Sequence, residues 1–593
     1  MNAIDQPQPP VDDRYRDSTI PVSKRVEILL GQMTLEEKAG LCFHTMIAPG
    51  SRGEIEAENP VMPVPSTTKL VLDQGMTHFN VLGAAPSGRE FAEWHNAVQR
   101  LAASTRLGIP VTLSTDPRHH FSENPGASIL AGPFSQWPET LGFGAIGDDR
   151  LMETFADIAR QEYAAVGLRV ALHPQIDLAT EPRWGRQNGT FGENAELTSK
   201  LGAAYIRGFQ GAALGPESVA TMTKHFPGGG PQQGGEDPHF AHGREQVYPG
   251  GNFEYHLKPF LAAFEAGTSQ IMPYYGMPVG TEYEEVGFGF NKSVITGLAR
   301  ERFGFDGIVC TDWGLLSDDE VLGVPFPARA WGVEHLPIAE RMLKVIEAGV
   351  DQFGGEALPE LLVELVRGGR IDEARLDQSA RRLLREKFVL GLFDSPFVDE
   401  DAAERIVGNA DFVAQGAQAQ RAALTVLAHG DETPELPLPK GVRIFAEGFA
   451  EEALAPFGVA VQNPDDADVA ILRLSAPFEP RPGFESFFHQ GSLAFEEEEI
   501  ARVTAIAGRV PTVLVVYLDR PAILTPFVGK AALVADFGAA QEAVLDVLFG
   551  DATAQGRLPF ELPSSMAAVE ANRPDVPSDT KDPLFPFGHG IAL

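Results

Sequence analysis

The sequence has little of three things: cysteine, basic residues and long apolar runs. Its two cysteines, Cys42 and Cys310, lie far apart in 593 residues, which excludes a disulfide framework and a cysteine-based metal cluster. Only 47 basic residues oppose 82 acidic ones, and the formal charge of −35 would repel nucleic acid and anionic membrane surfaces. No stretch of the sequence is long and apolar enough to span a membrane.

The N-terminal segment also lacks the apolar stretch of an export signal. Residues 1–20 are rich in Pro, Asp and Arg, so we expect a cytoplasmic protein. The chain does have enough apolar material for more than one core, because hydrophobic residues make up 44% of it and its length allows several domains. The acidic residues are spread along the chain, which is typical of a solvated surface rather than of an acidic tail.

Short apolar runs that end in polar residues recur through the first two thirds of the chain. They occupy residues 79–83, 109–116, 168–173, 219–225, 270–275, 308–312 and 350–353. Amphipathic stretches separate them, including residues 89–104, 149–166, 253–266 and 338–348. This α/β alternation predicts a (β/α)₈ TIM-type barrel with its active site at the carboxyl ends of the strands. A doubly wound open sheet is the alternative, but the Gly-rich phosphate turn typical of its first strand is missing.

A second α/β pattern follows the barrel and predicts a separate domain. We expect a barrel domain with an N-terminal extension over residues 1–390, a linker over 391–410 that is rich in Gly, Pro and acids, and an α/β sandwich domain over 411–593. A long helix is expected over residues 402–428. Strands with a mainly parallel arrangement are expected at residues 442–446, 459–462, 469–475, 512–518 and 532–537.

Two motifs in the barrel region carry polar residues at strand ends. Asp312 follows the apolar run 307–310, where it is either a helix cap or a carboxylate delivered to a polar pocket. Lys224 and His225 precede three glycines, which let a loop fold close against a ligand while the two side chains supply hydrogen-bond donors for hydroxyl groups. A P-loop is excluded because the lysine comes before the glycines.

Five motifs in chain order together resemble glycoside hydrolase family 3, of the β-glucosidase-like, two-domain type. They are Met33 to Lys38, Glu181 to Arg186, Lys224 to Gly228, Thr311 to Trp313, and Leu584 to Gly590. The resemblance implies a barrel followed by an α/β sandwich, and retaining hydrolysis of a glycoside with Asp312 as the nucleophile. Such an enzyme forms a covalent glycosyl-Asp intermediate, which a second acid/base group about 5–5.5 Å away helps to form and to hydrolyse.

The resemblance also implies which side chains bind the sugar. Asp116 matches a sugar-hydroxyl acceptor, Arg186 matches a sugar-binding arginine, and Lys224 with His225 match paired donors. Asp116 precedes a proline, so a turn-forming role is its alternative. Two further positions have open roles. Tyr275 either approaches the nucleophile or fills a barrel layer, and Trp313 either offers its ring to a sugar or packs at the rim.

The acid/base has three candidates. In two-domain relatives it usually comes from a loop of the second domain, which here offers Glu479, the favoured residue, and Glu485 as the second choice. The glycines that usually flank this glutamate are absent around Glu479, whereas Glu485 lies among phenylalanines that could raise its pKa. The third candidate, His239 with Asp237, resembles the triplet of N-acetylglucosaminidases, but Pro238 replaces its serine. We expect His239 to structure the loop or contact substrate.

The sequence therefore predicts a retaining, exo-acting β-glucosidase that acts on oligosaccharides or aryl glucosides. β-Xylosidase, β-N-acetylglucosaminidase and transglycosylase or phosphorylase activities are the alternatives. A non-enzymatic carbohydrate-binding protein would lack the nucleophile motif. We expect no cofactor and no metal. The adjacent side chains of His119 and His120 would diverge on regular structure, and His239 with His242 has plausible ligand spacing but no evident second pair of ligands.

Overall fold

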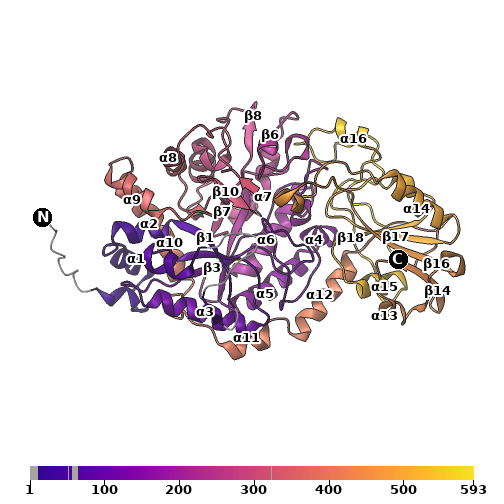
Figure 1. The fold of residues 1–593 in the computed structure, drawn as a ribbon, viewed down its shortest axis with the longest axis horizontal. Helices are drawn as coiled ribbons and strands as arrows, with labels where there is room; N and C mark the ends of the chain where they lie inside the picture. The colour runs from indigo at the N-terminus through magenta and orange to yellow at the C-terminus, as the bar shows by residue number, and fades with distance from the viewer. Residues whose placement is uncertain (1–10, 51–52, 56–64, 322–323) are drawn as a thin grey trace.

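The structure, a computed structural model, describes residues 11–50, 53–55, 65–321 and 324–593. Figure 1 shows two bodies side by side: the first two thirds of the chain form the larger one, and the last third, orange to yellow, forms the smaller one. We call them the barrel domain and the C-terminal domain. Residues 1–10, half of the segment in which no export signal is expected, lie outside the described residues.

The barrel domain is built around a ring of eight parallel strands. In order, they are β1 (Phe43–Ile47), β2 (His78–Val81), β3 (Thr112–Thr115), β4 (Leu168–Ala171), β5 (Ala220–Phe226), β7 (Gln270–Pro273), β9 (Ile308–Val309) and β12 (Phe353–Gly354). The ring closes beyond β9, where Cys310 and Gln352 form a parallel bridge and the Thr311 amide donates to the Gln352 carbonyl at 2.9 Å. The expected TIM-type barrel is confirmed.

Helices follow the strands and cover the outside of the ring. They are η3 (Lys69–Asp73), α3 (Gly88–Ala103), α5 (Asp149–Ala165), α6 (Ala195–Gln210), α7 (Phe253–Glu265), η8 (Ser293–Arg302), α8 (Ile338–Ala348) and α10 (Glu373–Val389). In α5, Met152, Phe155, Ala159 and Tyr163 recur every three or four residues and are all buried. Within the described residues, no helix combines the length and the apolarity needed to cross a lipid bilayer.

Further short elements surround the ring. Four helices are α1 (Val22–Leu30), α2 (Leu35–Leu41), α4 (Thr140–Ile146) and α9 (Pro359–Arg367). Two small sheets join β6 (Glu245–Val247) to β8 (Met277–Val279) in parallel, and β10 (Asp319–Val321) to β11 (Val324–Phe326) in antiparallel fashion. Helix α2 begins with a capping box, in which Thr34 and Glu37 each satisfy a backbone amide of the other. The motif at residues 33–38 therefore starts a helix.

The C-terminal domain contains a six-stranded sheet. In spatial order its strands are β13 (Thr425–Ala428), β18 (Ala532–Asp536), β17 (Thr512–Tyr517), β16 (Val469–Ser475), β14 (Val442–Glu447) and β15 (Gly458–Ala460). All pairs are parallel except β13 with β18. On β17, Val513 and Val515 join one apolar cluster while Leu514 and Val516 join another, so both faces of the sheet are buried. The mainly parallel α/β domain is confirmed.

Helices flank this sheet. They are α12 (Ala410–Ala423), α13 (Glu451–Leu454), α14 (Glu497–Ala507), α15 (Gln541–Leu548) and α16 (Met566–Ala571).

The long helix predicted over residues 402–428 is wrong. Residues 402–428 do not form one helix, because α11 (Glu400–Ile406) ends before Gly408, which has φ +63°, and Asn409 then caps α12. Helix α11 lies within the expected linker, where Ala403 packs against Gly88 of α3. The domain limits 1–390 and 411–593 stay a prediction.

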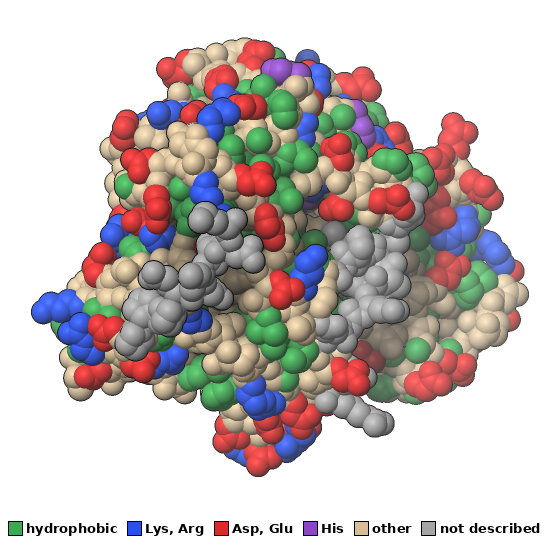
Figure 2. Space-filling model, turned by 60° about the vertical axis from the view of Figure 1, so that its left-hand side comes forward, with side chains coloured by type: hydrophobic (Ala, Val, Ile, Leu, Met, Phe, Trp, Pro, Cys, Tyr) green, Lys and Arg blue, Asp and Glu red, His purple; other side chains and the backbone are tan. Residues whose placement is uncertain are grey.

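Acidic side chains are spread over the face of the molecule that Figure 2 shows. They are drawn in red and are interspersed with basic ones (blue). Many of the basic groups are paired: Arg302 with Glu254 and Arg381 with Glu27 join segments of the barrel domain, and Arg443 with Asp468 lies on the C-terminal domain. Exposed pairs of this kind contribute little to stability, about 0–1 kcal/mol each. The face seen in Figure 2 is that of a solvated, acidic protein.

Candidate active site

One pocket at the carboxyl ends of the barrel strands collects every barrel residue to which the sequence analysis gives a nucleophilic or substrate-binding role. They are Asp116, Arg186, Lys224, His225, Tyr275, Asp312 and Trp313. Lys224 and His225 lie in β5, just before its end at Phe226, and the others lie beyond the ends of β3, β4, β7 and β9. Because all strands of the ring are parallel, their carboxyl ends share one rim, and loops that are distant in sequence converge there.

Asp312 lines this pocket and is buried, with 7% of its surface exposed. Its Oδ1 accepts a hydrogen bond from the Trp313 amide at 2.8 Å. Its Oδ2 lies 3.8 Å from His225 Nε2 and has no hydrogen-bond partner among the described residues. Buried polar atoms are rarely left unpaired, and those that are often serve a chemical purpose. One oxygen therefore fixes the carboxylate while the other faces the pocket.

Arg186 supplies a buried positive charge to the same pocket. It is 3% exposed, and its Nε and Nη1 have no partner among the described residues. Burial lowers the pKa of Arg186, but Tyr274, Asp237 and Asp312 outweigh that effect and raise the pKa above its ordinary value. The guanidinium therefore stays charged, and its Nε and Nη1 nitrogens can donate to a ligand.

Asp116 and Lys224 form a buried ion pair on the adjoining wall. Lys224 Nζ donates to Asp116 Oδ1 at 2.9 Å, and Asn80 Nδ2 donates to Asp116 Oδ2 at 3.1 Å. Both oxygens of the carboxylate are thus held in place. Asn80 was not predicted to belong to the site. The sequence feature that could have identified Asn80 is that a polar residue interrupts the apolar run of β2. In the structure it points to the same rim.

His225 is oriented by Asp177, a residue that the sequence analysis missed. His225 Nδ1 lies 2.7 Å from Asp177 Oδ2, and the His225 and Gly229 amides donate to Asp177 Oδ1 at 3.0 and 2.6 Å. Burial, followed by the charge of Arg186, lowers the pKa of His225 well below its usual range, so the imidazole is neutral. The signal for Asp177 is an acid between Ile176 and Leu178, just beyond β4.

The glycines after β5 approach protein rather than an open ligand space. A Cβ on Gly230 would lie 1.9 Å from the Leu178 carbonyl oxygen, and one on Gly229 would lie 3.1 Å from Asp177. The backbone of this loop can therefore reach Asp177 only because side chains are absent. The sequence predicts that the glycines let the loop fold close to a ligand. Instead they let the loop fold close to Asp177, which in turn orients His225.

Tyr275 and Trp313 lie beside the nucleophile. The Tyr275 hydroxyl donates to the Trp313 carbonyl at 2.8 Å, and Arg329 Nη2 donates to the same oxygen at 2.8 Å. Burial, together with the negative charge of Asp312, raises the pKa of Tyr275 well above its ordinary value. Tyr275 therefore remains a neutral hydroxyl at this wall. The Trp313 ring packs 5.3 Å from the His44 ring, measured between centroids.

His239 also lines the pocket of Asp312, and its imidazole contacts the Asp237 carboxylate. His239 Nδ1 lies 2.6 Å from Asp237 Oδ1, and the two residues are 6% and 0% exposed. The imidazole packs against the rings of Tyr275 and Phe488, each with centroids 4.6 Å away. Burial lowers the pKa of His239 below its ordinary value, and the negative charge of Asp237 offsets only part of this effect. The arrangement is that of an imidazole backed by a carboxylate.

Glu479 and Glu485 do not line the pocket of Asp312. Glu479 is exposed. Its amide donates to the Gln490 carbonyl, so the loop folds back on itself at this point. The Glu479 Oε1 then accepts a hydrogen bond from the Ser492 amide at 3.1 Å. Glu485 accepts from Arg481 at 2.6 Å and lines an adjoining apolar pocket that also includes His239. The residue of this loop that reaches the Asp312 pocket is Phe484.

Comparison with known proteins agrees with this geometry. Residues 77–386 match the glycosyl hydrolase family 3 N-terminal domain, and residues 335–593 match the family's C-terminal domain. The chain belongs to glycosyl hydrolase family 3. The resemblance seen in the sequence and the expectation of a glycoside hydrolase are thereby confirmed.

Two family 3 relatives span almost the whole chain. Beta-glucosidase C of Emericella nidulans is 50% identical over 582 residues, which cover 97% of this chain and 93% of that protein. The periplasmic beta-glucosidase/beta-xylosidase of Dickeya chrysanthemi is 42% identical over 601 residues, which cover 97% and 91%. The solved structure of a β-glucosidase from Erythrobacter marinus superposes with a TM-score of 0.77 at 22% identity, covering 98% of this chain and 84% of that one. This likeness confirms the two-domain family 3 fold.

The expected cytoplasmic location is wrong in the light of these family 3 relatives. The Dickeya enzyme is named as periplasmic, and neither of the two relatives is named as cytoplasmic. The expectation rested on the missing apolar stretch near the N-terminus. Export segments are removed from mature chains, so a sequence without one does not report the compartment.

Proposed function

We propose that this family 3 enzyme is a β-glucosidase that releases the terminal non-reducing β-D-glucosyl residue of oligosaccharides or aryl glucosides with retention of configuration. One observation carries the proposal. Asp312 has an oxygen without a hydrogen-bond partner among the described residues, in the pocket that also holds Arg186, Lys224 and His225. The relatives named β-glucosidase support glucose as the sugar.

In the first step, Asp312 attacks the anomeric carbon. The Trp313 amide fixes one carboxylate oxygen, and the free oxygen forms the bond to carbon while the glycosidic oxygen leaves. The product is a glycosyl ester of Asp312. Arg186, which stays cationic, opposes the negative charges that Asp312 and Asp237 bring into the same buried region. In the second step, water releases the sugar with the same anomeric configuration as in the substrate.

The buried polar wall binds the sugar hydroxyls. Asp116 offers carboxylate oxygens as acceptors, and Lys224, Arg186 and His225 offer donors or acceptors around the ring. Charged partners make the stronger hydrogen bonds to hydroxyl groups. The Asp116–Lys224 pair is buried and held by Asn80, and we infer that this wall receives the end of the sugar chain, as exo action requires.

We assign the proton donor to His239. As an imidazolium it gives its proton to the leaving oxygen, and as an imidazole it then takes a proton from the attacking water. Asp237, 2.6 Å away, orients the ring and stabilises the imidazolium. Glu479 has less support because it is exposed and does not line the pocket of Asp312. Glu485 is the alternative, since it lines the pocket next to His239, although its carboxylate is engaged by Arg481.

The decisive experiment compares His239→Ala, Glu485→Gln and Glu479→Ala on substrates with poor and good leaving groups. We expect His239→Ala to lower kcat/KM for cellobiose by about a hundredfold or more, because general acid catalysis contributes that much. It should spare kcat/KM for 2,4-dinitrophenyl β-glucoside, whose leaving group needs no proton, and azide should accelerate turnover by attacking the ester. The glutamate that shows this pattern instead of His239 would be the proton donor.

The nucleophile has its own test. Asp312→Ala should abolish hydrolysis of both substrates, and proton NMR of the first product formed by the unaltered enzyme should show the β-anomer. An α-anomer as the first product would refute a covalent intermediate on Asp312.

β-Xylosidase activity is the second candidate, because the Dickeya relative carries both names. A panel of nitrophenyl β-glycosides separates glucose, xylose and N-acetylglucosamine as the bound sugar. We expect the highest kcat/KM for glucose. Adding phosphate or an alcohol acceptor to the same assay would reveal a phosphorylase or transglycosylase as a product other than free sugar.

A further inference from the structure

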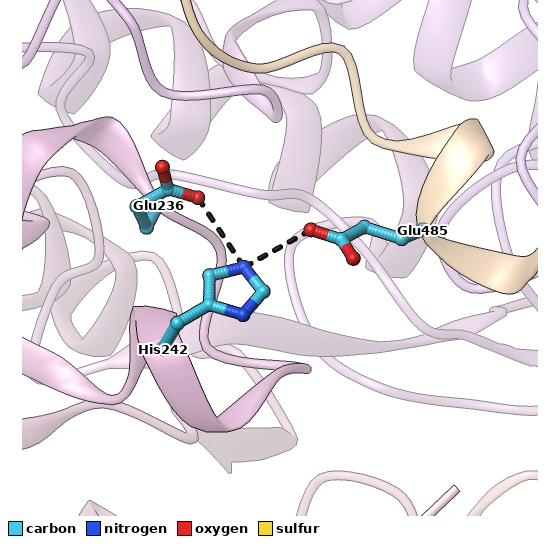
Figure 3. A group of neighbouring side chains, drawn as sticks. All are labelled: Glu236, His242 and Glu485. Atoms are coloured by element: carbon cyan, nitrogen blue, oxygen red, sulfur yellow. Dashed lines mark ion pairs between the residues drawn. The ribbon is translucent and has the colours of Figure 1, made fainter. Parts of the chain in front are cut away.

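A cluster of charged side chains joins the two domains beside the pocket of Asp312. Figure 3 shows His242 between the carboxylates of Glu236 and Glu485, which it meets at 3.3 and 3.0 Å. Glu236 and His242 come from the barrel loop that follows β5, and Glu485 comes from the loop that follows β16. The ligand atoms of the three lie within 4.8 Å of one another, a spacing that a metal site also has.

Arg481 already supplies the positive charge of this cluster. Its Nη1 and Nη2 donate to the two oxygens of Glu236, each at 2.8 Å. Nη1 also donates to Glu485 at 2.6 Å and lies 3.0 Å from His242 Nε2. The hydrogen bonds that Arg481 donates to Glu236 have the largest effect and raise the pKa of Arg481 further above its ordinary value. The guanidinium contacts all three side chains, so the cluster is a network centred on an arginine rather than a metal site.

This network encloses the short segment that carries His239. Glu236 and His242 lie on either side of Asp237 and His239 in sequence, and Arg481 binds Glu236 from the other domain. Gln490, fully buried in the C-terminal domain, accepts from the Asp237 amide at 2.6 Å. The His239 ring also packs on Phe488 of the same loop. The C-terminal domain thus fastens the His239 segment at three neighbouring points.

We propose that Arg481 is a positioning residue for the glycosidase reaction: it ties the His239 segment to the C-terminal domain so that the imidazole stays directed at the leaving oxygen. The proposal rests on the proposed function of His239 as proton donor. Arg481 does not line the pocket of Asp312, so it acts through His239 and not on the sugar. In this way the C-terminal domain takes part in catalysis without supplying the proton donor itself.

The electrostatics give the reason why loss of Arg481 should matter. Glu236 and Glu485 both approach His242 Nε2 within 3.3 Å, and the guanidinium is the cation that binds both. Without it, two carboxylates in close proximity repel each other, and the two loops should move apart. A shift of about 1 Å in a catalytic group can lower a rate by about a hundredfold.

The test uses the full chain and two substrates. We expect Arg481→Ala to lower kcat/KM for cellobiose by about tenfold to a hundredfold, because His239 is displaced. It should lower kcat/KM for 2,4-dinitrophenyl β-glucoside by less than about threefold, because that leaving group needs no proton. Arg443→Ala is the matched control. Arg443 lies in the same domain as Arg481 and also binds a carboxylate through two nitrogens. That carboxylate belongs to Asp468, which is far along the chain from the His239 segment.

A double-mutant cycle distinguishes positioning from a general loss of structure. In the His239→Ala background, Arg481→Ala should cause no further loss for cellobiose, because the group through which it acts is gone. Equal losses for both substrates, or losses that multiply in the double variant, would overturn the proposal. If Arg481→Ala melts at a much lower temperature than the parent, Glu236→Gln provides the same comparison with the arginine retained.

The cycle also separates this inference from the proposed function. If His239→Ala leaves cellobiose hydrolysis unchanged, the assignment of the proton donor fails and the role of Arg481 fails with it. If His239→Ala has its expected effect but Arg481→Ala behaves like Arg443→Ala, only the role of Arg481 is refuted.

Discussion

Glu139 is a buried carboxylate at the contact between the domains. It is 2% exposed and accepts from the amides of Phe121 and Ser122 at 3.1 and 2.8 Å, and from the Tyr517 hydroxyl at 3.3 Å. Its own amide donates to the Phe537 carbonyl at 2.8 Å. Burial raises the pKa of Glu139 to about 7 despite these hydrogen bonds.

This raised pKa makes stability depend on pH. The folded protein holds the Glu139 proton more tightly than the unfolded chain does, so the stability from this group is complete below its ordinary pKa of about 4.5 and is lost as pH rises toward about 7. Glu139→Gln keeps an acceptor oxygen and removes the titration. The difference in free energy of unfolding between the Glu139→Gln variant and the parent should shift in favour of the variant by about 2 to 3 kcal/mol between pH 5 and pH 8.

Urea denaturation at the two pH values measures this difference. The exposed Glu432→Gln is the control and should change the free energy of unfolding by less than about 0.5 kcal/mol at both. An equal effect of Glu139→Gln at pH 5 and pH 8 would mean that the Glu139 carboxylate is ionised in the folded state throughout.

At the same residue scale, the sequence predicts strand-end residues better than it predicts their partners. Asp312, Lys224 and His225 end recognisable apolar runs, and the parallel ring then places them on one rim. Asp177 was missed because its role exists only through contacts with His225 and Gly229, which are about 50 residues away in sequence. Glu479 was favoured by its distance from β16, but a backbone hydrogen bond within the loop turns it away.

Among the elements, the loop after β5 depends on glycine for its path. Gly230 has φ +109°, and a Cβ there would lie 1.9 Å from the Leu178 carbonyl oxygen. Gly230→Ala should push the loop away from the segment that carries Asp177 and disturb the Gly229 amide contact. We expect kcat/KM to fall by about tenfold or more, since small misplacements of site residues are costly.

Gly280→Ala is the matched control for this loop. Gly280 has φ +67°, and a Cβ there would meet nothing within 4 Å. It should cost about 1 to 2 kcal/mol from backbone strain and leave kcat/KM unchanged. The comparison requires steady-state kinetics and melting temperatures for both variants. If the two alanine variants keep the same kcat/KM, the close approach of Gly230 to Leu178 has no bearing on the site.

The strands that sequence reasoning missed have physical explanations. β1 follows α2 with only Cys42 between them, so no loop marks where the strand begins. His44 and Thr45 also interrupt its apolar pattern. The interior of the ring is polar there, and His44 Nε2 lies 2.7 Å from Ser114 Oγ. β13 follows α12 with only Leu424 between them, and the alanine-rich sequence that leads into it suits a helix equally well. Pairing of β13 with β18 decides the structure of Thr425–Ala428, and this long-range contact has no local signal.

For the whole molecule, the two domains are joined by buried polar groups as well as by apolar packing. Arg520 is 1% exposed and donates to the Arg183 carbonyl of the barrel domain at 2.9 Å. It also donates to the carbonyls of Pro477, Gln490 and Ser492 at 2.5, 3.1 and 3.0 Å. Burial lowers the pKa of Arg520 to about 10, which still leaves it charged at neutral pH.

Arg520 therefore connects the barrel domain to the loop that contains Arg481, Glu485 and Gln490. Arg520→Ala should leave several buried carbonyls without a donor, and each such group costs about 1 to 3 kcal/mol. We expect a loss of at least about 3 kcal/mol in the free energy of unfolding. Because the lost contacts lie at the domain boundary, calorimetry should resolve two transitions where the parent has one. Cellobiose hydrolysis should fall with the displaced loop.

The control for Arg520 is Arg509, which lies exposed on the C-terminal domain and donates to Asp465 at 2.7 Å. Arg509→Ala should cost no more than about 1 kcal/mol and leave one transition, since exposed ion pairs contribute little. If Arg520→Ala lowers the melting temperature but keeps a single transition, the two domains unfold as one unit held by their apolar contacts. If it costs no more than Arg509→Ala, the carbonyls around Arg520 find other donors and the buried guanidinium does not couple the domains.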